Sequence, residues 1–193
     1  MTLEIQPLTL DRWPDLKAIF NARGCSVARG CWCMYYRRSG KVPALRPGES
    51  QSSRNRTDLH ALASSDIPLG LIGYKNGVPV GWVSLGPRED FAKLARSTVM
   101  KPVDHLPVWS IICFVVPSQY RSQGVAKQLL VGAIEFAKAQ GAQLLEAYPV
   151  DLEETPKADS LWFGTKTMYE QTGFHEVARR KPGRPILRLK PRP

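Results

Sequence analysis

The chain has 193 residues, of which 43% are hydrophobic, enough to fill the core of one domain. Its 27 lysines and arginines outnumber its 17 aspartates and glutamates, and the resulting net charge of +10 favours acidic partners such as phosphates, an anionic cofactor or nucleic acid. The chain has no apolar run long enough for a membrane span or a signal peptide, so we expect a cytoplasmic protein with no membrane partner.

Apolar periodicity and turn residues predict the elements of the first half of the chain. They are a strand at 3–8, a helix at 9–24, an irregular segment at 25–48, a helix at 49–66, strands at about 69–75 and 78–85, and a connection with one or two helical turns at 86–107. The clearest signal is Asn76-Gly77, because this residue pair favours the two-residue turn of an antiparallel hairpin. Four cysteines are expected to be free thiols in a reducing compartment.

Three of these cysteines lie close together in the sequence, at Cys25, Cys31 and Cys33. With a distant histidine, either His60 or His105, they offer enough ligands for zinc, but the spacing is not that of paired CxxC motifs. We therefore expect no metal and interpret the segment as a buried loop rich in sulfur and aromatic side chains.

The second half of the chain predicts a strand–helix–strand unit followed by a helix and a hairpin. The elements are a strand at 108–116, a helix at 124–139, a strand at 142–148, a helix at 160–174, and closing strands at 175–180 and 185–191. The strand at 108–116 is apolar at both parities, so we expect it to be central, with Trp109, Ile111, Cys113 and Val115 on one face. A right-handed crossover makes this strand parallel to 142–148, and the hairpins make the sheet mixed, in an α/β or α+β domain.

The loop at 117–126 has the properties of an anion site. The start of a helix leaves backbone N–H groups unpaired and carries the positive end of the helix dipole. Gly124 and Ala126 are small enough for a ligand to approach the backbone, and Arg121 adds a positive charge. These features suit a pyrophosphate-sized anion, although the glycine pattern is neither a dinucleotide fingerprint nor a P-loop.

Two motifs resemble a known family. The sequence RSQGVA at 121–126 fits the pattern Q/R-x-x-G-x-G/A and resembles the acetyl-coenzyme A motif of the GCN5-related N-acetyltransferase (GNAT) superfamily. The sequence MYEQTGF at 168–174 is similar to the late segment of that family, and the order of elements agrees over residues 3–190. The resemblance is weakest over 25–48 and 86–107, the segments that would surround the acceptor site.

The resemblance implies a fold and a set of site residues. The expected fold is one GNAT-type domain at 1–193, with a mixed, mostly antiparallel sheet whose parallel pair splays at the middle, about four helices, and an irregular loop at 25–48. Backbone groups near Val115 or Val116 would bind the pantetheine arm, and amides in the loop would hold the pyrophosphate. The implied coenzyme-binding residues are Val115, Val116, Arg121, Gln123, Gly124, Val125, Ala126 and Lys127. Tyr169 matches the general acid that protonates the departing thiolate.

The general base is open. The central strand carries no carboxylate that could serve as the base. The candidates elsewhere in the chain are Glu89, Asp90, Asp104, His105 and Glu146. We retain Glu146, and the alternative is proton transfer to solvent through a chain of water molecules. An acidic patch at Asp151, Glu153 and Glu154 is a solvated loop or a rim that attracts a cationic acceptor.

The implied activity is transfer of an acetyl group from acetyl-coenzyme A to a primary amine of a small molecule or peptide, by direct attack in a ternary complex. Two alternatives stay open. One is a basic nucleic-acid-binding module, favoured by the net charge of +10 but lacking any helix-turn-helix, zinc-finger or RNP-like pattern. The other is a coenzyme-A-binding regulator of the same fold. A homodimer is also possible at this stage.

Overall fold

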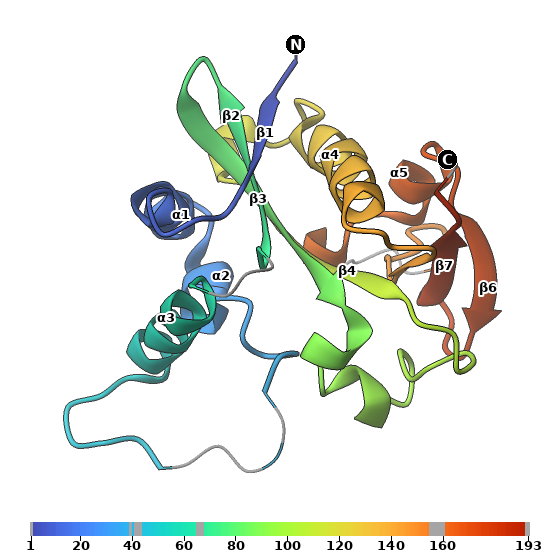
Figure 1. Ribbon diagram of the computed structural model, residues 1–193, viewed down its shortest axis with the longest axis horizontal. Helices are drawn as coiled ribbons and strands as arrows, with labels where there is room; N and C mark the ends of the chain where they lie inside the picture. The colour runs from blue at the N-terminus through green and yellow to red at the C-terminus, as the bar shows by residue number, and fades with distance from the viewer. Residues whose placement is uncertain (1, 39, 41–43, 65–67, 155–160, 192–193) are drawn as a thin grey trace.

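The computed structural model describes residues 2–38, 40, 44–64, 68–154 and 161–191 (Figure 1). Seven strands form one sheet in the order β1-β2-β3-β4-β5-β7-β6, and neighbouring strands are antiparallel except for the parallel pair β4 and β5. The strands are β1 Glu4–Pro7, β2 Gly70–Lys75, β3 Val78–Pro87, β4 Trp109–Val115, β5 Leu145–Ala147, β6 His175–Arg179 and β7 Pro185–Leu189. The mixed, mostly antiparallel sheet with a central parallel pair confirms the predicted fold class.

Helices cover both faces of this sheet (Figure 1). They are α1 Trp13–Asn21, α2 Ser26–Cys31, α3 Gln51–Leu62, α4 Val125–Ala139 and α5 Lys166–Glu170. On one face, α4 buries Val125, Leu129 and Ala133, which recur every four residues and so form a single apolar stripe. On the other face, α1 and α3 pack around Trp32, which stacks on Phe20 with a ring-centroid distance of 4.7 Å.

A β-bulge in β4 changes which side chains face α4. Ser84 of β3 pairs with Cys113, whereas the next residue of β3 pairs with Ile111, so Ile112 is an extra residue in β4. As a result Ile111 and Phe114 pack in the same cluster as α4, while Val115 packs on the opposite face. The strict alternation that we predicted for this strand is therefore wrong beyond Ile112.

Two further predictions differ from the structure. The segment 25–48 is not wholly irregular, because it contains the short helix α2. The helix predicted at 160–174 is divided into a 3-10 turn, η4 (Leu161–Phe163), and α5. Gly164 divides them with φ 74°, a left-handed conformation that favours glycine, and Thr165 then caps α5 by accepting a bond from the Met168 amide. Residues 65, 66 and 160 of the predicted helices lie outside the described residues.

Candidate functional site

The parallel strands β4 and β5 separate partway along their length. They are paired at three positions, Trp109 with Leu145, Ser110 with Glu146, and Ile111 with Ala147. β5 then ends, although the strand predicted there extended to 148, while β4 continues to Val115. The second half of β4 therefore lacks a strand partner on that side, and the predicted splay is present.

The loop that leads from the splay into α4 presents free backbone donors. Gly124 is the N-cap residue of α4 with φ 76°, and Ser122 is also left-handed, with φ 58°. No side chain caps the helix, and within the described part of the chain the amides of residues 122–127 bond to no other protein group. Successive unpaired amides at the start of a helix can bind an anion, and the anion site at this loop stays a prediction.

The side chains of this loop hold its shape. Arg121 donates from Nη2 to the carbonyl of Gly24 at 2.6 Å and from Nε to the carbonyl of Val116 at 3.0 Å. Gln123 donates to the carbonyl of Gln119 at 2.7 Å. The guanidinium that we expected to serve mainly as a charge for the pyrophosphate therefore also ties the loop to the turn after α1.

Two other residues fix α4 at its first turn. Val125 is buried in the core beneath the loop, and Lys127 donates from Nζ to Oε1 of Gln171 at 2.9 Å, which links α4 to the end of α5. Ala126 is half-buried and adds no bulk at the helix start. The predicted coenzyme-binding residues at 121–127 are thus brought together by one loop and one helix turn.

Val115 and Val116 differ in which side of β4 their backbone groups face. The carbonyl oxygen of Val115 points toward Gly81 of β3. Because backbone groups alternate sides along a strand, those of Phe114 and Val116 face the gap left by β5. The Val116 carbonyl already accepts the bond from Arg121, so of its two backbone groups the amide stays free for a ligand within the described chain, and the role of both positions in pantetheine binding stays a prediction.

Tyr169 lies beside this gap with its hydroxyl fully buried. Its ring contacts those of Phe114 and Phe174 edge-on, at centroid distances of 6.3 and 5.1 Å. Among the described residues the hydroxyl has no hydrogen-bond partner, which is costly for a buried polar group. Burial raises the pKa of Tyr169 well above its usual value, so the phenol keeps its proton at neutral pH and is a competent donor.

Glu146, the retained base candidate, is in the paired part of β5 and is fully buried. Its carboxylate accepts bonds from Arg88, from Arg188 at 2.8 Å and from the Tyr148 hydroxyl at 2.8 Å. Arg188 also binds Asp104, another candidate, and holds the pKa of that carboxyl at about 2. These surroundings favour a structural role for Glu146, and its role as a base stays a prediction.

The splayed parallel pair, the uncapped helix start at its open end and the buried tyrosine beside it define an acetyltransferase fold of the GNAT class. The model of the Acetyltransferase (GNAT) family matches residues 34–162, and the chain belongs to this family. No curated protein matches the chain.

Solved structures show the same fold at low sequence identity. A ribosomal-protein-alanine N-acetyltransferase from Brucella melitensis is 20% identical with a TM-score of 0.54, over 97% of this chain and 99% of that one. PaiA N-acetyltransferase from Thermoplasma acidophilum, in complex with coenzyme A, is 18% identical with a TM-score of 0.50, over 98% and 99% of the two chains. An acetyltransferase from Thermus thermophilus is 17% identical with a TM-score of 0.55, over 98% and 97%.

Replacing Gly124 with valine should weaken coenzyme A binding at least tenfold, because the branched side chain would fill the space in front of the free amides. Gly141, at the other end of α4, is the matched control, since its φ of 81° is close to the 76° of Gly124 and the space around both positions is open. Each substitution should cost about 1–2 kcal/mol of folding free energy through left-handed strain. If isothermal titration showed that Gly141→Val weakens coenzyme A binding as much as Gly124→Val does, the result would contradict the predicted anion site.

Proposed function

We propose that the protein transfers the acetyl group of acetyl-coenzyme A to a primary amine, which attacks the thioester directly in a ternary complex. The observation that carries this proposal is the buried, unpartnered hydroxyl of Tyr169 beside the splay between β4 and β5. A neutral phenol in that position has a proton and, among the described residues, no protein acceptor for it. The free amides of the loop before α4 provide a matching site for the pyrophosphate of the co-substrate.

The residues divide the chemistry among them. The amides from Gln123 to Lys127 bind the pyrophosphate, and the backbone of Val116 orients the pantetheine arm in the gap. Tyr169 donates its proton to the sulfur as the carbon–sulfur bond breaks, since a thiolate leaves more readily once it is protonated. Because Glu146 is held by two arginines, we propose that the ammonium group loses its first proton to solvent before the attack, and that the second proton, released from the nitrogen as the amide forms, returns through water to the Tyr169 phenolate.

The test joins a binding measurement to a turnover measurement. Titration with acetyl-coenzyme A should show one site per chain, and a panel of primary amines should contain members that release free thiol with equal amounts of acetylated amine. If acetyl-coenzyme A binds and no amine is acetylated, the result favours a catalytically silent coenzyme-A-binding regulator over an enzyme. If acetyl-coenzyme A does not bind and the protein retards the migration of nucleic acid in a salt-sensitive manner, the result favours a basic nucleic-acid-binding module over both the enzyme and the regulator.

A further inference from the structure

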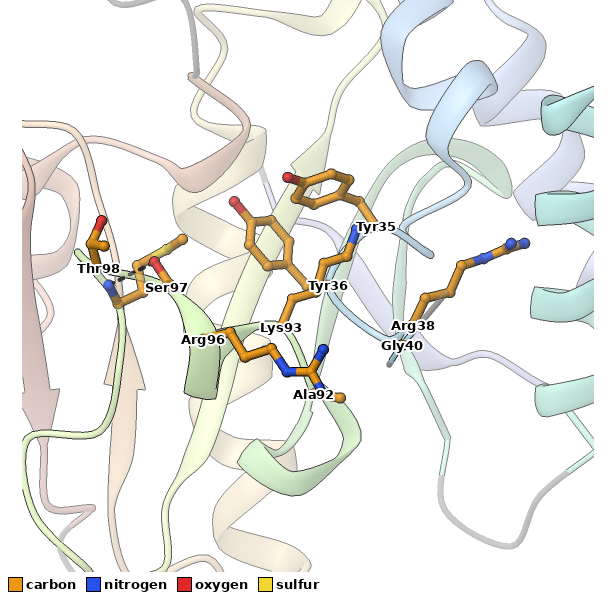
Figure 2. Close-up of a pocket in the computed structure, with 10 residues that line it drawn as sticks. Tyr35, Tyr36, Arg38, Gly40, Ala92, Lys93, Arg96, Ser97 and Thr98 are labelled. Atoms are coloured by element: carbon orange, nitrogen blue, oxygen red, sulfur yellow. Dashed lines mark hydrogen bonds between the residues drawn. The ribbon is translucent and has the colours of Figure 1, made fainter. Parts of the chain in front are cut away.

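A cavity of about 510 Å³ lies between the segment that follows α2 and the segment between β3 and β4 (Figure 2). Its lining is aromatic, basic and small: Tyr35, Tyr36, Arg38, Gly40, Ala92, Lys93, Arg96, Ser97, Thr98 and Met100. The two segments are joined by the Lys93 amide, which donates to the carbonyl of Tyr36 at 3.1 Å. This volume is within the range of small-molecule sites in proteins.

The cavity has a positive lining. Of the described residues that line it, three are basic and none is acidic. Arg38 forms an ion pair with Asp58 at 2.6 Å, and in Figure 2 its side chain extends away from Lys93 and Arg96. Lys93 lies over the ring of Tyr35, with Nζ 3.7 Å from the ring centroid, and so keeps its charge unpaired by any carboxylate that the structure describes.

Arg96 is the second uncompensated charge. It comes from η2 (Leu94–Arg96), its side chain is exposed, and it forms no ion pair with any residue in the described ranges. η1 (Arg88–Asp90) carries two carboxylates: Asp90 pairs with Arg37 at 3.6 Å, and Glu89 forms no ion pair with a described residue and does not line the cavity. Lys93 and Arg96 therefore present two cations to whatever enters.

The position of the cavity relates it to the reaction centre. β4 begins after the segment that carries Lys93 and Arg96 and ends at the loop before Gly124, so the cavity and the anion site lie at opposite ends of this strand. Tyr36 packs edge-on against Phe163 at a centroid distance of 5.7 Å, and the next residue, Gly164, lies against the ring of Tyr169. The cavity wall is thus linked to Tyr169 through contacts of Tyr36, Phe163 and Gly164.

Two of the three carboxylates of the acidic patch, Asp151 and Glu154, are engaged by cations among the described residues. Asp151 pairs with Lys166 at 3.2 Å and with Arg179 at 2.9 Å, and Glu154 also pairs with Arg179. Asp151 and Glu154 are compensated by neighbouring cations, whereas Glu153 is exposed and, like Lys93 and Arg96, forms no ion pair with any described residue.

We infer that the cavity binds the non-reacting end of the acceptor and that this end carries a carboxylate or phosphate, held by Lys93 and Arg96. The acceptor is then a small amine with an anionic group, placed so that its amine reaches the splay beside Tyr169. This inference rests on the proposed acetyl transfer. Tyr35 and Tyr36 supply flat apolar walls for the part of the acceptor between its two ends.

The test compares matched amines and charge-reversal variants. Amino acids, amino alkyl phosphates, their neutral amides and esters, and diamines of equal length should be ranked by kcat/KM. The kcat/KM of both anionic sets, the amino acids and the amino alkyl phosphates, should exceed that of the neutral and cationic amines by about tenfold or more. The set with the higher kcat/KM shows whether the acceptor's anionic group is a carboxylate or a phosphate. Lys93→Glu and Arg96→Glu should each lower kcat/KM for the anionic amines about a hundredfold, mainly through KM, and raise the relative rate of diamines.

Lys138→Glu is the charge-matched control, because Lys138 is exposed near the end of α4, away from the cavity. All three variants should keep the circular dichroism spectrum and the acetyl-coenzyme A affinity of the wild type. A preference for diamines, acetylation of a charged tRNA alone, or an equal effect of Lys138→Glu would overturn the anionic acceptor while leaving acetyl transfer intact. If no amine were acetylated at all, the result would instead contradict the proposed acetyl transfer itself.

Discussion

Replacing Tyr169 with phenylalanine should lower kcat by about a hundredfold or more, since general acid catalysis contributes about 10²–10⁴. The change removes one hydroxyl that has no partner among the described residues, so neither folding stability nor acetyl-coenzyme A affinity should fall. Because burial raises the pKa of Tyr169 well above its usual value, ionisation of this phenol should not reduce the wild-type rate below about pH 10.

Tyr74→Phe is the matched control for this substitution. The Tyr74 hydroxyl donates to Asp15 at 2.7 Å, between β2 and α1, far from the splay. Its loss should cost about 1 kcal/mol of stability and leave kcat unchanged. Steady-state thiol release and denaturant unfolding on both variants separate the two effects. An unchanged kcat in Tyr169→Phe would show that another group protonates the leaving sulfur.

Replacing Glu146 with alanine should destabilise the fold by about 3–5 kcal/mol, because Arg88 and Arg188 would stay buried without their common partner. Guanidinium unfolding measures this loss directly. Glu146→Gln keeps the shape of the side chain and should also be destabilised, because the amide cannot neutralise two guanidinium groups.

The glutamine variant also decides the role of this carboxylate. A structural Glu146 predicts that the fraction of Glu146→Gln that stays folded keeps a near-wild-type kcat and the wild-type pH profile. If that variant were as stable as the wild type, yet slow and without the wild type's rise in rate with pH, Glu146 would be the base after all.

The parts of the fold that could be predicted from the sequence are those fixed by short-range patterns. The hairpin at Asn76-Gly77 and the strand–loop–helix unit around Gly124 have turn and capping signals within a few residues, and both are present. The family motif at the same loop identified the free amides for the same reason, since the pattern and the geometry occupy one stretch of chain.

The rest depends on contacts between distant residues. The extra residue at Ile112 shows only once β3 is paired with β4, because a bulge leaves no mark in an apolar strand. The two arginine partners of Glu146, Arg88 and Arg188, are 58 and 42 residues away in the sequence. No local pattern therefore indicates that this candidate base is buried in two ion pairs. The charged cavity was likewise missed, since Lys93 and Arg96 meet Tyr35 and Tyr36 only through folding of two irregular segments.

The link from Arg121 to Gly24 has a consequence for the order of events on the molecule. The same guanidinium donates to the carbonyl of Val116, and the amide of Ser118 donates to the carbonyl of Arg23 at 3.0 Å. The turn after α1 and the loop before α4 are therefore joined by hydrogen bonds into one unit. That turn leads directly into α2 and the segment with Tyr35 and Tyr36. If the two proposed substrates both bind to this unit and one changes the affinity for the other, thermodynamic reciprocity requires that the second changes the affinity for the first by the same factor.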